Sequence, residues 1–223
     1  MENKDRSVLN IKKDILKQSW KKTKNNFWFL VGILILVSLI NTVPLTVSTP
    51  EQQGLFMFTS LISALLSLWL SLGVIKIILD MTRDKNYRFL DLFLQAKLIP
   101  KFLVSTIIYD LIVTVGFLLL IVPGIIWAIK FELFPYFIVE EGMGPIEALK
   151  ASSQITSGDK WNLFLLGLLL LLINVLGFLA LIVGMLVTYP LSMLAMAYAY
   201  IHLKKAKFSK TPPETKEKAP ATA

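Results

Sequence analysis

Hydrophobic residues gather into long runs that carry almost no charge. Residues 27–47 contain no Asp, Glu, Lys or Arg, residues 55–79 contain only Lys76, and residues 161–203 again contain none. A helix needs roughly 20 apolar residues to cross a bilayer, so the last run is long enough for two. The pattern predicts an all-α polytopic membrane protein. We place six transmembrane helices at about residues 27–47, 55–79, 102–122, 125–139, 161–182 and 185–203.

Short connections join these helices into three hairpins. They are residues 48–54, a turn at Pro123 and Gly124, and the region near Gly184, and none of them contains Lys or Arg. A Pro-Gly pair is a turn signal, so Pro123 and Gly124 predict a tight hairpin between the third and fourth helices. The alternative is one long helix over residues 102–129, which would give five spans.

The fourth predicted helix, residues 125–139, has the weakest pattern. It is short for a spanning helix and contains Lys130 and Glu132. A tilted helix, a re-entrant segment and a helix screened by its neighbours all remain open interpretations.

Lysine and arginine concentrate in the segments that lie on the other side of the membrane from these connections. Residues 1–26 carry eight, residues 80–101 five, residues 140–160 two and residues 204–223 six, which is 21 of the 23 present. Segments rich in these residues stay in the cytoplasm, so both termini are predicted to be cytoplasmic. The expected location is the cytoplasmic (inner) membrane of a prokaryote. The five-span alternative would leave the last six bases outside.

The sequence divides into three regions. Residues 1–26 form a predicted cytoplasmic basic amphipathic helix, residues 27–203 the six-helix domain, and residues 204–223 a tail without apolar core residues that we expect to be disordered. Residues 84–100 are a second predicted amphipathic helix.

The first amphipathic helix has an apolar face with Val8, Ile11, Ile15 and Ser19 at helical spacing. Its basic residues point elsewhere. Such a helix lies in the membrane interface, with lysines against lipid head groups, and anionic lipids are the expected partner. The candidate head-group contacts are Lys12, Lys13, Lys17 and Lys21.

An internal repeat accounts for this organisation. Residues 16–19 (LKQS) resemble residues 149–152 (LKAS), and residues 29–32 (FLVG) fall on residues 164–167 (FLLG) after a two-residue insertion. Three copies of a unit, each a cytoplasmic amphipathic helix followed by a hairpin, would give six spans. Repeats of this kind are common in transporters but do not establish transport.

Composition excludes several classes of function. The chain has no cysteine and one histidine, His202, so cysteine metal sites, thiol catalysis and a histidine-based metal site are not expected. No motif of a catalytic site or cofactor site is present. The net charge of +8 does not indicate nucleic acid, because the basic residues sort by side of the membrane.

Apart from Lys76 near the end of the second span, three charged residues fall inside predicted spans, where each costs at least about 2.5 kcal/mol on insertion scales. Asp110, Lys130 and Glu132 lie at similar expected depth on the third and fourth helices. They form either an ion pair that fixes the hairpin or a polar site on a substrate or proton path. A third interpretation places a short fourth segment near water. Asn41 and Asn174 also lie within spans, where we expect them to bond to neighbouring helices.

The second half of the chain resembles a known family in its motifs. They are residues 121–130 (IVPGIIWAIK), residues 134–140 (FPYFIVE) and residues 145–152 (PIEALKAS). This pattern is similar to the membrane domain attached to some glycerophosphoryl diester phosphodiesterases, and to related stand-alone bacterial multi-pass proteins of unknown function. The resemblance implies a membrane domain without the phosphodiesterase barrel.

These patterns favour a non-catalytic membrane protein, an accessory or scaffold that contacts lipid or a partner protein. A protein partner or a homo-oligomer fits this interpretation equally. The alternatives are a small transporter or channel that uses the polar residues of the third and fourth helices, and an intramembrane lipid enzyme.

Overall fold

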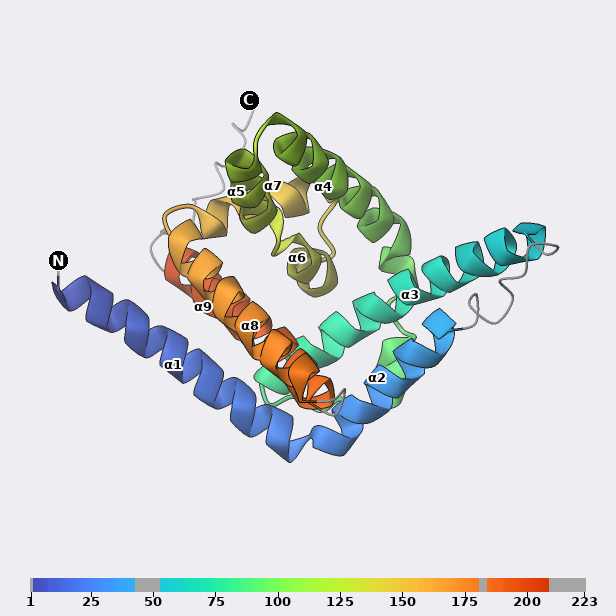
Figure 1. Ribbon diagram of the computed structural model, residues 1–223, viewed down its shortest axis with the longest axis horizontal. Helices are drawn as coiled ribbons and strands as arrows, with labels where there is room; N and C mark the ends of the chain where they lie inside the picture. The colour runs from blue at the N-terminus through green and yellow to red at the C-terminus, as the bar shows by residue number, and fades with distance from the viewer. Residues whose placement is uncertain (1, 43–52, 181–183, 209–223) are drawn as a thin grey trace, which may run out of the picture.

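The computed structural model describes residues 2–42, 53–180 and 184–208 (Figure 1). All its regular structure in these ranges is helical. The elements in chain order are α1 (Glu2–Asn25), α2 (Phe27–Thr42), α3 (Gln53–Thr82), η3 (Phe89–Leu92), η4 (Ala96–Leu98), α4 (Ile99–Leu119), α5 (Ile121–Phe131), α6 (Phe134–Glu141), α7 (Pro145–Thr156), α8 (Lys160–Leu179) and α9 (Met185–Phe208).

The predicted class, an all-helical polytopic membrane protein, is confirmed. Five segments are long and apolar enough to cross a bilayer, and a bent pair, α1 from Ile11 with α2, gives a sixth if it is counted as one span. The two parts of this pair meet at 83°. Part of the first predicted outer connection, residues 48–52, lies outside the described residues. So do most of the predicted disordered tail, from residue 209, and residues 181–183 before Gly184.

The chain breaks between the third and fourth spans, so the single long helix over residues 102–129 is wrong. The break falls at Leu120, which is extended (φ −169°, ψ 153°), and not at Pro123 and Gly124. Those two residues lie inside the first turn of α5, where proline is tolerated because its missing N–H would have no helical partner. Gly124 instead permits close packing, since a Cβ atom there would lie 2.6 Å from the ring of Phe117.

The predicted amphipathic helix over residues 84–100 is also wrong. The chain there forms two short 3₁₀ turns, η3 and η4, before α4 begins at Ile99. Leu92 is fully buried against α3 at Gly73, where an added Cβ would lie 2.1 Å from the Leu92 carbonyl oxygen. The indole Nε1 of Trp69 donates a hydrogen bond of 3.1 Å to the Phe93 carbonyl. These close backbone contacts hold the segment in turns.

The fourth span is a broken helix, α5 followed by α6, with the interruption at Glu132 and Leu133. The last helix departs from the prediction in length. α9 continues to Phe208, so residues 204–208 are helical and do not belong to a disordered tail.

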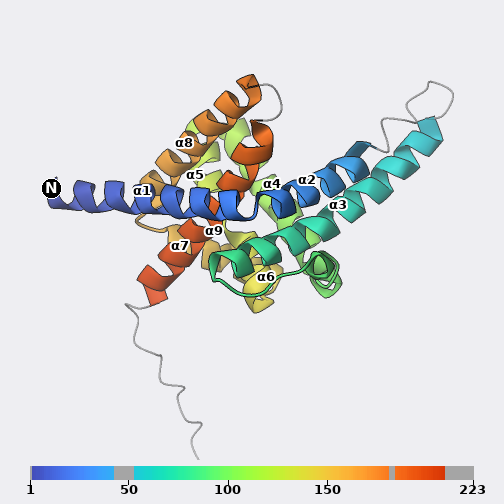
Figure 2. The same cartoon turned by 90° about the horizontal axis from the view of Figure 1, so that it is seen from below.

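The hairpins α2–α3, α4–α5 and α8–α9 surround α6 (Figure 1). Each segment that leads into a hairpin packs against the second helix of another hairpin. The helix α1 leads into α2 and lies on α9. The turns η3 and η4 lead into α4, and η3 lies on α3. The helix α7 leads into α8 and lies on α5 and α6. Seen from below, α1 passes across the molecule, with the end of α8 on one side of it and α6 on the other (Figure 2).

Candidate functional site

The three charges predicted to lie together do not form ion pairs with one another among the described residues. Asp110 is exposed on α4, and Glu132 is exposed at the break between α5 and α6. The Lys130 ammonium lies 5.0 Å from the centre of the Phe131 ring. Equal depth along two helices therefore did not bring these side chains into contact.

The backbone at Lys130, in contrast, is part of a buried polar cluster. The Ser152 hydroxyl of α7 accepts a hydrogen bond from the Leu133 N–H and donates one to the Lys130 carbonyl, each at 3.1 Å. The Thr156 hydroxyl donates to the same carbonyl at 3.0 Å. Ser152 and Thr156 are both fully buried. Since backbone groups left unpaired in a membrane cost several kcal/mol, these hydroxyls make the helix break tolerable.

The two asparagines within the spans hydrogen-bond to neighbouring helices. Ser67 of α3 donates to the Asn41 side-chain oxygen at 3.0 Å, and the Asn174 amide donates to the Ser192 hydroxyl of α9 at 2.7 Å. These bonds join α2 to α3 and α8 to α9.

A charged cluster that the sequence did not predict fastens the ends of α3, α6 and α9. The Glu140 carboxylate accepts hydrogen bonds of 2.6 Å from Arg83 and from the Tyr200 hydroxyl, and Lys204 lies 3.1 Å from it. Lys204 also pairs with Glu141. The charged members all lie on the predicted cytoplasmic side, and Tyr200 lies near that end of the sixth predicted span. This shared side was the only available signal.

A second pair also went unpredicted. Lys76 of α3 binds Asp80 one turn later, at 2.6 Å. The spacing i, i+4 is a general signal for such a pair, but Asp80 falls just outside the predicted second span.

The first helix differs from a helix that rests on lipid alone. Its apolar side, with Ile15 half-buried and Ser19 and Thr23 buried, packs on α9. Three of the four lysines predicted to contact head groups are exposed, namely Lys13, Lys17 and Lys21. Lys12 is half-buried and borders a pocket. Lys12 therefore faces the interior of the protein as well as the outer surface of the molecule.

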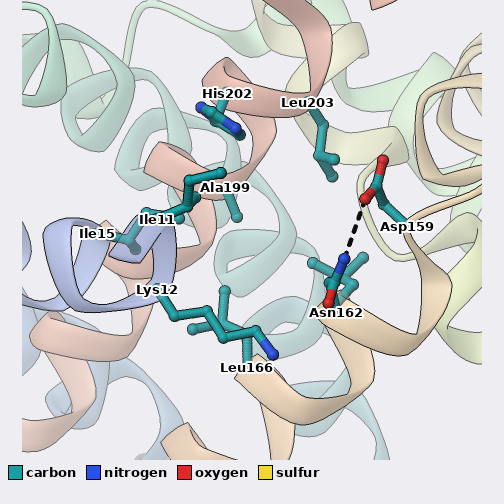
Figure 3. A pocket seen from close by; sticks show the side chains of 10 residues that line it. Ile11, Lys12, Ile15, Asp159, Asn162, Leu166, Ala199, His202 and Leu203 are labelled. Carbon is teal, nitrogen blue, oxygen red and sulfur yellow. Dashed lines mark hydrogen bonds between the residues drawn. The ribbon is translucent and has the colours of Figure 1, made fainter. Parts of the chain in front are cut away.

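This pocket lies between α1, α8 and α9 and has a volume of about 80 Å³ (Figure 3). Its polar border consists of Lys12, Asp159, Asn162 and His202. The Asn162 amide donates to the Asp159 carboxylate at 3.1 Å and holds it in place. The other lining residues are apolar: Ile11, Ile15, Leu163, Leu166, Ala199 and Leu203.

The lining of this pocket offers both signs of charge among apolar side chains. Lys12 is a hydrogen-bond donor to an anion, and Asp159 is an acceptor for an ammonium group. The described residues contain no group of three His, Cys, Asp or Glu side chains able to hold a metal ion. The pocket is therefore suited to a small zwitterionic group attached to an apolar chain.

These helices and the similarities below define a bacterial multi-pass membrane protein. Residues 105–208, a little under half of the chain, match the family described as "Protein of unknown function (DUF975)". A UPF0259 membrane protein of Yersinia pestis is 30% identical over 112 residues, 48% of this chain and 44% of that protein. One from Sodalis glossinidius is 39% identical over 62 residues, 28% of this chain and 25% of that protein.

The chain thus spans less than half the length of these curated relatives. Their names describe them as membrane proteins. This agrees with the stand-alone membrane proteins to which the sequence motifs point. No solved structure matches the chain.

Proposed function

We propose that this protein is a non-catalytic membrane protein that binds a phospholipid of the cytoplasmic leaflet in the pocket between α1, α8 and α9. The observation that carries the proposal is that Lys12 and Asp159, from separate segments of the chain, line one pocket whose other lining residues are mostly apolar. A phospholipid with an ethanolamine head group has the matching chemistry. Its phosphate would bind Lys12, and its primary ammonium would bind Asp159.

The surroundings of the pocket support a lipid over a soluble ligand. The exposed Lys13, Lys17 and Lys21 continue along the same helix, where each lysine adds about 1 kcal/mol of attraction to an anionic membrane surface. Trp161 directly precedes Asn162 in the chain. It is 69% exposed, as is typical of an aromatic side chain at the membrane interface. In this proposal the membrane, and not a soluble molecule, covers the pocket.

The proposed topology places this pocket at the inner surface of the cytoplasmic membrane. The distribution of lysine and arginine supports it. Reporter fusions after Lys24 and Gly158 should report the cytoplasm, and a fusion at Gln52 should report the outside. A cytoplasmic Gln52 fusion would contradict the six-span topology.

The lipid proposal is tested with the full-length protein in nanodiscs by native mass spectrometry. Phosphatidylethanolamine should be retained in preference to phosphatidylcholine, because a quaternary ammonium cannot donate a hydrogen bond to Asp159. Lys12→Gln should lower retention about fivefold, the equivalent of about 1 kcal/mol. Asp159→Asn should abolish the preference for ethanolamine.

Lys13→Gln is the matched control, since Lys13 is the next residue on α1 and is exposed away from the pocket. It should leave the preference unchanged. Equal losses in the Lys12 and Lys13 variants would indicate general attraction to the membrane and would overturn the pocket assignment.

One observation favours the alternative of a small transporter. A second hollow, between α4, α5 and α8, is bordered by Tyr109 and Glu132 within the predicted spans and is otherwise lined by apolar residues and Gly167. A carboxylate there could take part in a proton or solute path. Flux into proteoliposomes that is lost in Glu132→Gln would support transport. Absence of flux with the tested solutes, together with lipid retention, would favour the lipid-binding function.

A further inference from the structure

The repeat extends further in the structure than the two short sequence matches, LKQS with LKAS and FLVG with FLLG. In both copies a buried serine is followed four residues later by a buried threonine, Ser19 with Thr23 in α1 and Ser152 with Thr156 in α7. Each helix then turns into a transmembrane helix, and a tryptophan follows the threonine by five residues, at Trp28 and Trp161. The two helical elbows are therefore equivalent positions of the repeat.

The two threonines have different partners. The Thr156 hydroxyl has carbonyl acceptors within reach, among them that of Lys130 at the break between α5 and α6 at 3.0 Å and that of Ser152 in its own helix at 2.9 Å. Thr23 is only 1% exposed, yet its hydroxyl has no hydrogen-bond partner among the described residues. A buried hydroxyl without a partner costs free energy, and such groups in native structures call for an explanation. Among the described residues, no counterpart of the Lys130 carbonyl bonds to Thr23 in α1.

Thr23 borders a hollow at the elbow between α1 and α2, with a volume of about 610 Å³. The other polar residues around it are Lys24, Asn25 and Asn26. Asn26 is held in place, because it donates to the Lys22 carbonyl and accepts from the Tyr87 hydroxyl. An ammonium and an amide thus border this space, and the Thr23 hydroxyl, which has no described acceptor, lies buried in its wall.

Two tryptophans border the same hollow. Trp20 is 53% exposed and Trp28 is 83% exposed. Tryptophan at such a position is typical of the boundary between head groups and acyl chains. An anion bound at this elbow would therefore lie at head-group depth, next to aromatic surface suited to the glycerol and acyl region of a lipid.

We propose that the elbow between α1 and α2 is a binding site for the phosphate of an anionic phospholipid, with the Thr23 hydroxyl and the Lys24 ammonium as its donors. The lipid oxygen takes the place that the Lys130 carbonyl holds for Thr156 in the other copy. The site is separate from the pocket at Lys12 and Asp159 and does not depend on the function proposed there.

The test uses the full-length protein in detergent, with lipid binding followed by native mass spectrometry. Phosphatidylglycerol should bind more tightly than phosphatidylcholine. Thr23→Val, which keeps the shape of the side chain, should weaken phosphatidylglycerol about tenfold, because a hydrogen bond to a charged group is lost. Lys24→Gln should weaken it about fivefold.

Two variants serve as controls. Lys21→Gln removes an exposed charge on the same helix outside the hollow, and Thr59→Val removes an exposed hydroxyl that bonds to the Leu55 carbonyl. Neither should change phosphatidylglycerol binding. Unchanged binding in both Thr23→Val and Lys24→Gln would overturn the site, and so would equal losses in Lys21→Gln and Lys24→Gln.

A further arm identifies the source of the phosphate. Soluble glycerol phosphate should not displace phosphatidylglycerol at equal concentration, because it lacks the chains that lie against Trp20 and Trp28. Displacement at equal concentration would overturn the assignment to lipid. Lys12→Gln and Asp159→Asn should leave phosphatidylglycerol binding intact, so failure at the elbow and failure at the other pocket give different results.

Discussion

The helices α1 and α7 share a sequence motif but lie in different surroundings. α7 is enclosed by α4, α5, α6 and α9, and half of its twelve residues are buried. α1 contacts mainly α9 and keeps four lysines exposed, at positions 13, 17, 21 and 24. The serine and threonine are buried in both helices.

The difference shows how one motif can have two uses. In α7 the hydroxyls bond to a helix break that the chain itself provides. In α1 the same pair meets α9, and the threonine has no partner within the described residues. A motif that completes the backbone in one copy of a repeat thus leaves a donor for a ligand in another.

The largest expected effect comes from removing the hydroxyls of α7. The double variant Ser152→Ala and Thr156→Val leaves the Leu133 N–H and the Lys130 carbonyl without these partners. Each unpaired buried group costs about 1–3 kcal/mol, so we expect a loss of about 3 kcal/mol. Thermal unfolding in detergent measures it. The corresponding variant of α1, Ser19→Ala with Thr23→Val, should lose far less, and equal losses would contradict the comparison.

The opposite end of α6 offers the next test. Glu140→Gln keeps an acceptor for the Tyr200 hydroxyl but weakens the contacts with Arg83 and Lys204. Hydrogen bonds between charged groups contribute about 1.5–3 kcal/mol, and the carboxylate is partly exposed, so we expect a loss of about 2 kcal/mol. Unfolding curves of the variant at low and high salt check this. A salt-independent loss would show that charge is not the cause.

A smaller effect is expected at Lys130, where the backbone and not the ammonium holds α7. Lys130→Met should change stability by less than about 0.5 kcal/mol, because no ion pair with Asp110 or Glu132 is broken. Melting in detergent is again the measurement. A large loss that Asp110→Asn and Glu132→Gln together restore would show that these charges do pair.

The smallest effect concerns Thr23 alone. In lipid-free detergent Thr23→Val should be neutral or slightly stabilising, by up to about 0.5 kcal/mol, because a buried hydroxyl without a partner is replaced by a methyl group. The melting temperature with and without phosphatidylglycerol measures this. Stabilisation of wild type by the lipid should exceed that of the variant, and identical shifts would count against the hydroxyl as a donor.

The sequence was sufficient for the helical membrane class, because runs without charge require burial in lipid whatever the packing. It was not sufficient for the segment over residues 84–100. Apolar and polar residues fall on opposite faces at helical spacing there, which suggested a helix, but the absence of a side chain at Gly73 lets Leu92 approach α3 in a turn. Contacts between distant residues decided the local conformation.

The candidate site was predictable only in part. Sequence spacing gives depth in the membrane, and depth alone made Asp110, Lys130 and Glu132 neighbours. It does not give the direction in which a side chain leaves its helix, and Asp110 proved to be exposed. The partners of Asn41 and Asn174 were easier to predict, because an asparagine that points toward another helix finds an acceptor or a donor in almost any direction. The pockets at α1 required the packing of α1 on α9, which no local pattern contains.

The packing of α1 on α9 also sets an order of events during synthesis. The chain emerges from the ribosome at about 5–20 residues per second, so α1 exists for several seconds before α9 does. The later helices must enter the bilayer while α1 still lacks its partner, and its exposed lysines can keep it at the membrane surface during that interval. Docking of α1 on α9 therefore follows the synthesis of α9, and the hollow at the elbow acquires its wall at Val187 only at that step.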